Sequence, residues 1–464
     1  MISSTNPATG ETLRAYPALS PGALEEKLAL ARQTFMSHRQ TSFAQRTAWM
    51  HRAAQILDDE RETLARIMTE EVGKTLQSSR DEITKCALAL RFFADHAQGF
   101  LADEPLSISA GKSFVRYQPL GPILAIMPWN FPLWQVVRFA APALMAGNVG
   151  LLKPAETVPA CALALETVFV RAGFPPGAFQ TLLVETEAVA GIIGDPRVAA
   201  ATLTGSEAAG RAVAAQCGAA LKPIVLELGG SDPFVVLPSA DIAEAVRVGV
   251  QARTQNNGQS CIAAKRFIIH RDVYDDFAKR CAQSMAALKV GDPRHPDTQV
   301  GPLHTARARE TLHRQVQDSI AGGARLLTGG QKGEGAGFFY APTVLCDVSP
   351  GMPAYSEELF GPVAVLLRAD DTGHAIALAN DTQFGLGASV WSAEGAEQER
   401  LVNELECGMV FVNSMVSSSP SLPFGGIKAS GFGRELSVPG IRAFVNAKTV
   451  SLGAAKRAPA LAGE

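Results

Sequence analysis

Between Val115 and Asp241 the sequence alternates short apolar runs with helical patterns, and this alternation is the strongest constraint on the fold. Two parallel neighbouring strands must be joined by a long crossover, usually a helix, so such alternation predicts a parallel α/β sheet. Five runs qualify as strands of this sheet: GPILAIMP, VGLLKP, FQTLLV, AAATLTG and PIVLELGG.

A second series of strands follows Asp241, and the 464-residue length favours more than one domain. The candidate strands of this second α/β domain are RFIIH, APTVL, FGPVAVLL, GASVW and GMVFVN. Ahead of both series, residues 21–97 carry apolar side chains at spacings of three and four, which predicts helices.

Composition excludes several classes of protein. A net charge of −3 offers no basic field for a nucleic acid. The most apolar stretch, residues 120–147, is interrupted by four prolines, so we expect no membrane span. The seven cysteines form no CxxC pair and the eight histidines no HExxH motif, which predicts no disulfide framework, no metal and a cytoplasmic protein.

The sharpest chemical signal is Cys261, in the loop Gly258-Gln-Ser-Cys. Cysteine is a strong nucleophile once deprotonated, and a small glycine-containing loop leaves room for a substrate carbonyl beside the sulfur. The alternative is a buried structural cysteine, which is the commoner use of this residue.

Two further residues are candidates for catalysis. Glu227 ends an apolar run, where burial would raise its pKa and make it a better base; the alternative is a carboxylate that pairs with a cation or caps a helix. Asn130 lies between a strand and a helix opened by Pro132. Its amide can donate to an oxyanion, or it can serve as a helix N-cap.

Two segments have the pattern of a ligand site at the carboxyl end of a sheet. Lys153 and Glu156 follow the second strand, where α/β sheets bind ligands, although a solvated loop is the alternative. The segment from Thr204 through Ser206 to Gly210 follows a strand and opens a helix, whose free N–H groups suit a pyrophosphate. Its GxxxxG spacing differs from the GxGxxG of ordinary Rossmann domains.

Taken together, these segments resemble the aldehyde dehydrogenase superfamily. PWNFP, KPAE, TGS, LELGG, GQSC, EELFGP and PFGG occur in its order and rough spacing, from Asn6 to about Val450. In finer detail the chain is similar to the short bacterial succinate-semialdehyde dehydrogenases, through ILAIMPWNFPLWQV, LELGGSDPF, AAKRFII, LECGMVFVN and SGFGREL.

The resemblance implies a role for each matching residue. Cys261 would be the nucleophile, Glu227 the base that activates water, and the Asn130 amide part of the oxyanion hole. The residues expected to bind the cofactor are Trp129, Lys153, Glu156, Gly205, Ser206, Glu358 and Phe360. Those expected at the substrate are Arg138, Trp134, Gln255, Ser419 and Phe424.

The expected reaction is the NAD(P)-dependent oxidation of an aldehyde to an acid, with succinate semialdehyde as substrate. Arg138 is a lone cation in an apolar stretch, which favours an anionic partner: a substrate carboxylate, or a structural ion pair as the alternative. Gln255 stands where many such enzymes have a second arginine, which implies a wider tolerance for uncharged aldehydes. Glu156, facing the adenosine ribose, predicts NAD over NADP.

Other functions remain open at this point. A CoA-acylating or phosphate-reducing relative has less need of Glu227, and a catalytically silent structural or binding protein has no need of the intact Cys261, Glu227 and Asn130 set. A broad-specificity aldehyde dehydrogenase is the nearest alternative.

The resemblance also implies the domain organisation. We expect a Rossmann-type NAD(P)-binding domain over residues 1–106 and 119–240 and an α/β catalytic domain over 241–440. A small β oligomerisation arm is expected over 107–118 and 441–455, forming a homodimer or homotetramer, and residues 456–464 are expected to be a disordered tail.

Overall fold

The computed structural model describes residues 2–106 and 112–453. A short hairpin opens the chain, and four helices then follow, as the spacing over residues 21–97 predicts. Ser20, Ser42 and Thr75 each accept a hydrogen bond from a first-turn N–H group, which explains where three of these helices begin. The elements are β1 (Ile2–Thr5), β2 (Thr12–Tyr16), α1 (Pro21–His38), α2 (Phe43–Asp59), α3 (Arg61–Val72) and α4 (Leu76–Phe100).

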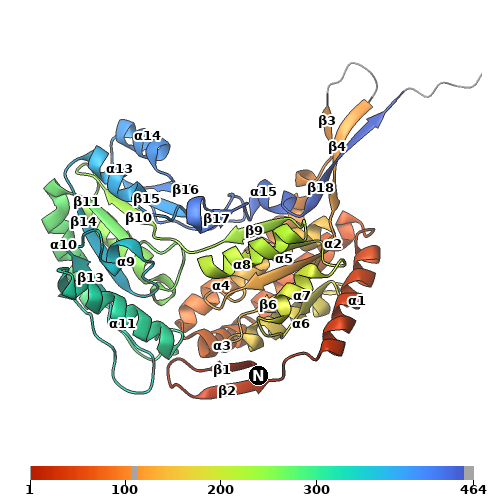
Figure 1. The fold of residues 1–464 in the computed structure, drawn as a ribbon, viewed down its shortest axis with the longest axis horizontal. Helices are drawn as coiled ribbons and strands as arrows, with labels where there is room; N and C mark the ends of the chain where they lie inside the picture. Colours follow the sequence, from red (N-terminus) through yellow and green to blue (C-terminus); the bar gives the residue numbers. More distant parts are fainter. Residues whose placement is uncertain (1, 107–111, 454–464) are drawn as a thin grey trace, which may run out of the picture.

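The first sheet contains the five parallel strands that the alternation predicts. Its order is β17-β9-β8-β5-β6-β7, with β5 to β9 all parallel and the short β17 antiparallel at one edge (Figure 1). The strands are β5 (Pro122–Met127), β6 (Val149–Pro154), β7 (Phe179–Thr181), β8 (Ala200–Thr204), β9 (Ile224–Glu227) and β17 (Gly431–Phe432). The helices between them are α5 (Trp134–Ala146), α6 (Pro159–Ala172), α7 (Ala188–Gly194) and α8 (Glu207–Ala219).

The second sheet has seven strands in the order β12-β13-β14-β11-β10-β15-β16, all parallel except the edge strand β12. Its strands are β10 (Pro233–Val236), β11 (Arg266–His270), β12 (Arg325–Thr328), β13 (Thr343–Cys346), β14 (Val363–Ala369), β15 (Gly387–Trp391) and β16 (Met409–Val412). Its helices are α9 (Ile242–Thr254), α10 (Arg271–Ala286), α11 (Ala306–Ala321), α12 (Pro353–Ser356), α13 (Thr372–Asn380) and α14 (Gly395–Glu404).

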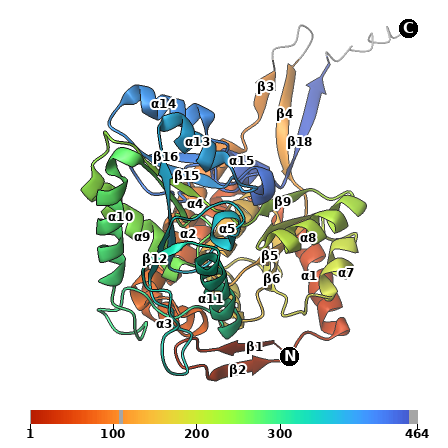
Figure 2. The same ribbon diagram turned by 60° about the vertical axis from the view of Figure 1, so that its left-hand side comes forward.

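The division between the two sheets differs from the expected boundary at residue 240. Strand β10 already belongs to the second sheet, where Phe234 pairs with Phe267, so the chain changes sheets between Glu227 and Pro233. A four-residue apolar strand carries no local mark of the sheet it joins, and its partners lie more than thirty residues away. The α/β fold class itself is confirmed, and Figure 2 shows the two sheets in separate lobes.

A three-stranded antiparallel sheet projects from the body in both views (Figures 1 and 2). It pairs β18 (Val445–Leu452) with β4 (Lys112–Pro119), and β4 with β3 (Glu104–Leu106). Strands β4 and β18 lie within the segments 107–118 and 441–455, for which an oligomerisation arm is expected, whereas β3 precedes the first segment and residues 441–442 belong to α15 (Ser437–Arg442). Residues 107–111 and the expected tail, 456–464, lie outside the described residues.

The fold gathers the sequence motifs at one edge of the first sheet. Strands β9, β8, β5 and β6 are adjacent and parallel, so their carboxyl ends meet on the same side. Those ends carry Glu227, the Thr204 segment, the segment leading to Asn130, and Lys153. Ligands of open α/β sheets bind at this edge, so the topology points to a site here.

Candidate active site

The cysteine loop turns sharply before Cys261. Asn256, Asn257 and Gly258 have left-handed φ values of 52°, 57° and 76°. At Gly258 a side chain is excluded outright, because a Cβ atom would lie 2.3 Å from the carbonyl carbon of Gly361. The asparagine at 257 is held in this conformation by its own side chain, which donates to the carbonyls of Gly73 and Pro302 and accepts from the N–H of Gly301.

The carbonyl groups of this loop are bound from several directions. Lys265 Nζ donates to the carbonyls of Ser260 (3.1 Å), Cys261 (2.8 Å) and Ala263 (3.3 Å). Arg253 Nη2 donates to the carbonyl of Gly258 at 2.5 Å. Because the carbonyl oxygens are turned toward these cations, the loop keeps one backbone conformation around the thiol.

The Cys261 thiol is half-buried and lines a cavity of about 230 Å³. Burial raises the pKa of this thiol to about 12, while the charges of Arg138 and Lys265 act in the opposite direction. The resting group is therefore a protonated thiol at neutral pH. A reaction that uses Cys261 as nucleophile must remove this proton when the site is occupied.

Asn130 lines the same cavity, with its side chain held in one orientation. Its Nδ2 donates to the carbonyl of Gln259 at 3.0 Å, and its Oδ1 accepts from Gln135 Nε2 at 3.1 Å. One Nδ2 hydrogen remains for a ligand in the cavity. Asn130 is not a helix cap, because α5 begins at Trp134 and Glu82 Oε1 accepts the N–H groups of Leu133 (2.9 Å) and Trp134 (2.8 Å).

Glu227 stands at the end of β9 and is 2% exposed. Neither of its carboxylate oxygens has a hydrogen-bond partner among the described residues. Burial, and secondly the charge of Glu435, raise its pKa well above the ordinary value, while Arg138 and Arg434 act in the opposite direction. A carboxyl group in this state has the basicity that proton transfer from water requires.

Most residues expected to hold the dinucleotide share the cavity with Cys261. Trp129, Gly205, Ser206, Glu358 and Phe360 all line it. Ser206 caps α8 by accepting the N–H of Ala209 at 3.3 Å, so the N-terminus of a 13-residue helix opens at this edge. A helix N-terminus beside a cavity suits a pyrophosphate group, and a second cavity of about 330 Å³ continues from the first past Trp129, Glu358 and Phe360.

Glu358 connects the cofactor residues with the cysteine loop. Its Oε1 accepts from the N–H of Gly230 at 3.2 Å and lies 3.3 Å from Lys265 Nζ. A Cβ atom at position 229 would stand 2.6 Å from Glu358 Oε2, so the LELGG glycine leaves the space this carboxylate needs. The same lysine thus binds both the Cys261 carbonyl and Glu358.

Lys153 and Glu156 lie outside the lining of both cavities. Lys153 is buried at the end of β6, and burial lowers its pKa, while the charges of Glu156 and Glu187 oppose this shift. Glu156 is exposed in the following turn. The described residues give neither side chain a hydrogen-bond partner, so both remain available to a ligand.

Arg138 has an acidic partner within the protein. Its Nε lies 2.6 Å from Glu435 Oε2, and the two side chains are 3% and 5% exposed. The guanidinium also stacks over the Phe424 ring, 4.5 Å from its centroid, and Nη2 donates to Thr204 Oγ1 at 3.4 Å. This is the structural ion pair that the sequence left open as the alternative to a substrate carboxylate.

The other expected substrate residues divide into two groups. Ser419 and Phe424 line a third cavity, of about 450 Å³, between β16 and the PFGG segment. Trp134 reaches the same wall through its Nε1, which donates to Ser418 Oγ at 3.0 Å. Gln255 is directed instead to the backbone, with its Nε2 3.4 Å from the carbonyl of Ala252.

Several supporting residues carried no motif. Lys74 forms a buried ion pair with Glu82 and donates to the carbonyl of Asn130 at 3.2 Å. Gln135 orients the Asn130 amide, and Lys265 orients the cysteine loop. Only Glu82 stands within a helix pattern, whereas Lys74 lies between α3 and α4 and Lys265 directly precedes β11, so no periodicity marked either lysine as buried.

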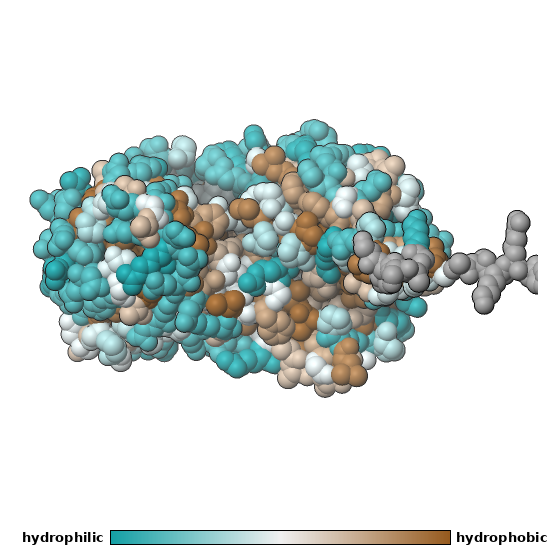
Figure 3. Space-filling model, turned by 90° about the horizontal axis from the view of Figure 1, so that it is seen from above, coloured by the Kyte–Doolittle hydropathy of each residue, from teal (hydrophilic) through white to brown (hydrophobic). Residues whose placement is uncertain are grey.

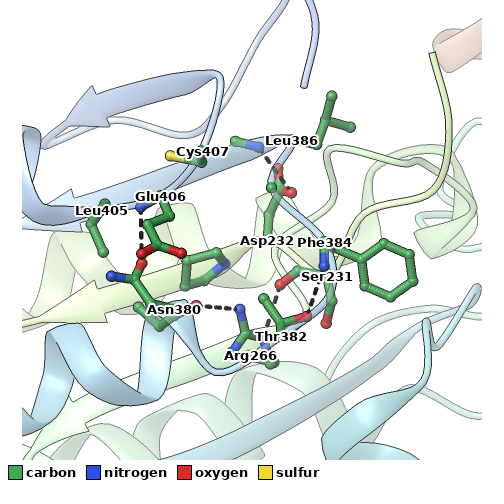
Figure 4. Close-up of a pocket in the computed structure, with 14 residues that line it drawn as sticks. Ser231, Asp232, Arg266, Asn380, Thr382, Phe384, Leu386, Leu405, Glu406 and Cys407 are labelled. Carbon is green, nitrogen blue, oxygen red and sulfur yellow. Dashed lines mark hydrogen bonds between the residues drawn. The ribbon is translucent and has the colours of Figure 1, made fainter. Parts of the chain in front are cut away.

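A small cavity between α13 and β15 is distinct from this site (Figure 4). It is lined by Asp232, Arg266 and Cys407 among others, and its volume of about 10 Å³ holds at most one water molecule. Burial raises the pKa of Asp232 to about 7, and its Oδ1 accepts the N–H of Gly387 at 3.1 Å. The cavity is too small for an organic substrate.

A metal site and a membrane-spanning helix are both absent from the part of the chain that the structure describes. No cluster of three or more His, Cys, Asp or Glu side chains is arranged to hold a metal ion. Within residues 2–106 and 112–453, no helix combines the length and the apolar character needed to cross a membrane.

Comparison with known proteins agrees with the motifs and the site. The model of the aldehyde dehydrogenase family matches residues 1–450. A Mycobacterium avium protein named succinate-semialdehyde dehydrogenase (NADP(+)) is 54% identical over 466 residues, which cover 100% of this chain and 99% of that protein. The solved succinic semialdehyde dehydrogenase from Streptococcus pyogenes, in complex with NADP+, is 35% identical with a TM-score of 0.96, over 98% of this chain and 100% of that one.

A more distant solved structure extends the comparison to the other nicotinamide cofactor. The aldehyde dehydrogenase from Bacillus cereus, in complex with NAD+, is 29% identical with a TM-score of 0.94, over 97% of this chain and 93% of that one. The resemblance carried by PWNFP, LELGG and GQSC is therefore confirmed over nearly the whole length. The chain belongs to the aldehyde dehydrogenase family.

Proposed function

We propose that the protein oxidises succinate semialdehyde to succinate with a nicotinamide dinucleotide, through a thioester on Cys261. The observation that carries this proposal is the cavity lined by Cys261, Asn130 and five of the seven expected cofactor residues. Glu227, whose carboxylate has no hydrogen-bond partner among the described residues, directly precedes Leu228, which belongs to the lining of that cavity. The substrate is supported by the names of the relatives.

The residues of the first cavity suit the acylation half of the reaction. The Cys261 sulfur, once deprotonated, attacks the aldehyde carbon, and the carbonyl oxygen becomes an alkoxide. The free Nδ2 hydrogen of Asn130 and the backbone N–H of Cys261 would stabilise this oxyanion. A dinucleotide held by Trp129, Ser206, Glu358 and Phe360 would supply the hydride acceptor, and loss of the hydride from this carbon would leave a thioester on Cys261.

Glu227 suits the deacylation half. Its carboxylate takes a proton from water, and the oxygen of that water attacks the thioester carbon. The tetrahedral intermediate then expels the Cys261 thiolate and releases the carboxylic acid. Lys265 and Asn256 hold the loop backbone during both halves, so the sulfur returns to its starting position.

For the cofactor, the names of the relatives favour NADP, against the NAD preference expected from Glu156. Glu156 is exposed and unpartnered among the described residues, so its carboxylate is free to turn away from a 2′-phosphate. Lys153, at the end of β6, would then provide a positive charge for that phosphate. A kcat/KM higher for NAD than for NADP would restore the original expectation.

Steady-state rates test the substrate. The protein is supplied with either cofactor and with succinate semialdehyde, glutarate semialdehyde, butanal or benzaldehyde. The proposal requires the highest kcat/KM for succinate semialdehyde. Equal rates for butanal and the semialdehyde would instead identify a broad-specificity aldehyde dehydrogenase, which is the alternative that Gln255 favours.

The arm would join two copies of the chain. Its edge strands β3 and β18 present unpaired backbone groups and the exposed side chains of Leu106 and Leu452. In Figure 3 apolar side chains show mainly on the lobe nearer the arm, while the opposite lobe is largely hydrophilic. Light scattering after size-exclusion chromatography would give the mass of a dimer or tetramer, and a monomer would exclude this role.

A further inference from the structure

Lys265 is a buried cation whose side chain binds the backbone of the cysteine loop. It directly precedes β11 and is 1% exposed. Its ammonium has three hydrogens to donate, and three carbonyl oxygens lie within hydrogen-bond distance: those of Ser260 (3.1 Å), Cys261 (2.8 Å) and Ala263 (3.3 Å). Burying a charge is costly, so a lysine spent on one short loop indicates a role beyond packing.

The carbonyl of Ser260 belongs to the same peptide group as the N–H of Cys261. In a trans peptide these two bonds lie in one plane and point in opposite directions, and the described residues contain no cis peptide bond. The N–H of Cys261 is therefore directed away from the Lys265 ammonium. Among the described residues no atom accepts this N–H, and Cys261 lines the cavity of about 230 Å³. The N–H is thus available to an oxyanion in that cavity.

Hydrogen bonds at a carbonyl oxygen change the N–H of the same peptide group. They draw electron density toward the oxygen and make the N–H a stronger donor. The Ser260 oxygen accepts two such bonds, one from Lys265 Nζ and one from the N–H of Ala263 at 3.2 Å. The bond from the ammonium is the stronger of the two, because its donor carries a full charge.

The acidic groups around Lys265 favour its charged form. Burial lowers the pKa of Lys265, whereas the charge of Glu358 opposes this shift. Arg253 acts in the same direction as burial, and Asp232 acts against it. Glu358 Oε1 lies 3.3 Å from the ammonium, so a carboxylate stands beside the cation without taking the place of the three carbonyl groups.

The other expected oxyanion donor has the same arrangement. The Asn130 side chain also lines the cavity, and its Oδ1 accepts a hydrogen bond from Gln135 Nε2 at 3.1 Å. Both amides therefore offer an N–H to the cavity and accept a hydrogen bond at their carbonyl oxygen. The two bonds come from different parts of the chain, so one local fold does not account for both.

We propose that Lys265 is a positioning residue that polarises the Ser260–Cys261 peptide group and so strengthens the backbone donor of the oxyanion hole. The inference rests on the proposed function, which it deepens by naming the residue that acts on this donor. Lys265 does not touch the substrate. Its effect belongs to reactions in which negative charge develops on a substrate oxygen, and it is absent when the same thiolate reacts without forming an oxyanion.

The test compares two reactions of Cys261 that need neither a dinucleotide nor an aldehyde. With 4-nitrophenyl acetate, the thiolate attacks the ester carbon, an oxyanion forms, and its collapse expels 4-nitrophenolate and leaves an acetyl thioester. With iodomethane, the thiolate displaces iodide and no oxyanion forms. Both reactions need the same ionised and accessible thiol, so the ratio of the acylation to the methylation rate constant cancels changes in thiol ionisation and loop position. Peptide mass mapping, with Cys261→Ala as the blank, assigns both reactions to Cys261.

In Lys265→Met this ratio should fall about three- to tenfold, a fraction of the about 100- to 1,000-fold that loss of a whole oxyanion donor costs. Asn130→Ala removes the other donor and should lower the ratio as well. Lys222→Met is the matched control, because Lys222 Nζ also donates to two backbone carbonyls, those of Ile193 and Asp195. Lys222 precedes β9, at the opposite end of the strand from Glu227, and its replacement should leave the ratio unchanged.

An unchanged ratio in Lys265→Met overturns the proposal, even if both reactions slow together, because Lys265 then acts only on the thiol or on the position of the loop. A parent protein that is methylated but not acylated at Cys261 overturns it too. If Lys265→Met does not fold, Lys265→Gln, which keeps a donor and loses the charge, provides the same comparison.

The proposed function is decided separately, by the oxidation rates. A parent protein that oxidises no aldehyde, but whose ratio falls in Lys265→Met, would refute the proposed function and support this inference. Oxidation of the semialdehyde together with an unchanged ratio would support the proposed function and refute this inference.

Discussion

Arg138 and Glu435 form an ion pair inside the protein, with Nε 2.6 Å from Oε2 and less than a tenth of either side chain exposed. Burial is the first cause of the raised pKa of Glu227; the charge of Glu435 raises this pKa further, and the charge of Arg138 acts in the opposite direction. The pair therefore sets the electrostatic environment of the candidate base as well as holding α5 against the segment that follows PFGG.

Breaking this pair should destabilise the protein. Arg138→Leu and Glu435→Gln should each cost about 3–5 kcal/mol of unfolding free energy, because the remaining partner is left buried and uncompensated. The double variant should recover part of that loss in a urea-unfolding cycle. We expect Arg138→Leu to slow oxidation of the semialdehyde and of butanal alike; a selective rise in KM for the semialdehyde would instead assign the substrate carboxylate to Arg138.

Removing the thiol should abolish oxidation without preventing cofactor binding. Cys261→Ala should show no turnover, whereas quenching of its tryptophan fluorescence by the dinucleotide should persist, because Trp129, Ser206 and Glu358 remain in the cavity wall. Cys407→Ala is the matched control: it removes a half-buried thiol that lines only the small cavity of Figure 4, and it should remain active. Turnover by Cys261→Ala would exclude the thioester route.

Glu227→Gln should separate the two halves of the reaction. Acylation needs the Cys261 sulfur and the Asn130 amide, whereas hydrolysis of the thioester needs the base. A rapid-mixing experiment should therefore give about one equivalent of reduced cofactor per site, followed by a rate at least about 100-fold below the parent rate. If the burst slows as much as the steady state, Glu227 acts on the thiol rather than on water.

The local sequence pattern was sufficient to predict the strands and to locate the chemical motifs. The five runs from Pro122 to Glu227 are parallel strands, and the motifs at their carboxyl ends meet at one edge because parallel topology leaves no other arrangement. Cys261 could be singled out as the candidate nucleophile because the cysteine, its glycine turn and the neighbouring motifs lie within short segments of sequence.

Contacts between segments that are far apart in the sequence could not be predicted from the local sequence pattern. Nothing near Arg138 indicates that Glu435, almost three hundred residues later, neutralises it, and nothing near Lys85 indicates that it meets Ser418. Strand β10 joins the second sheet for the same reason, since its partners are chosen by packing of Phe234 against Phe267. The periodicity of apolar residues indicates which side of a helix or strand is buried. Which residue that side contacts depends on the tertiary structure of the whole chain.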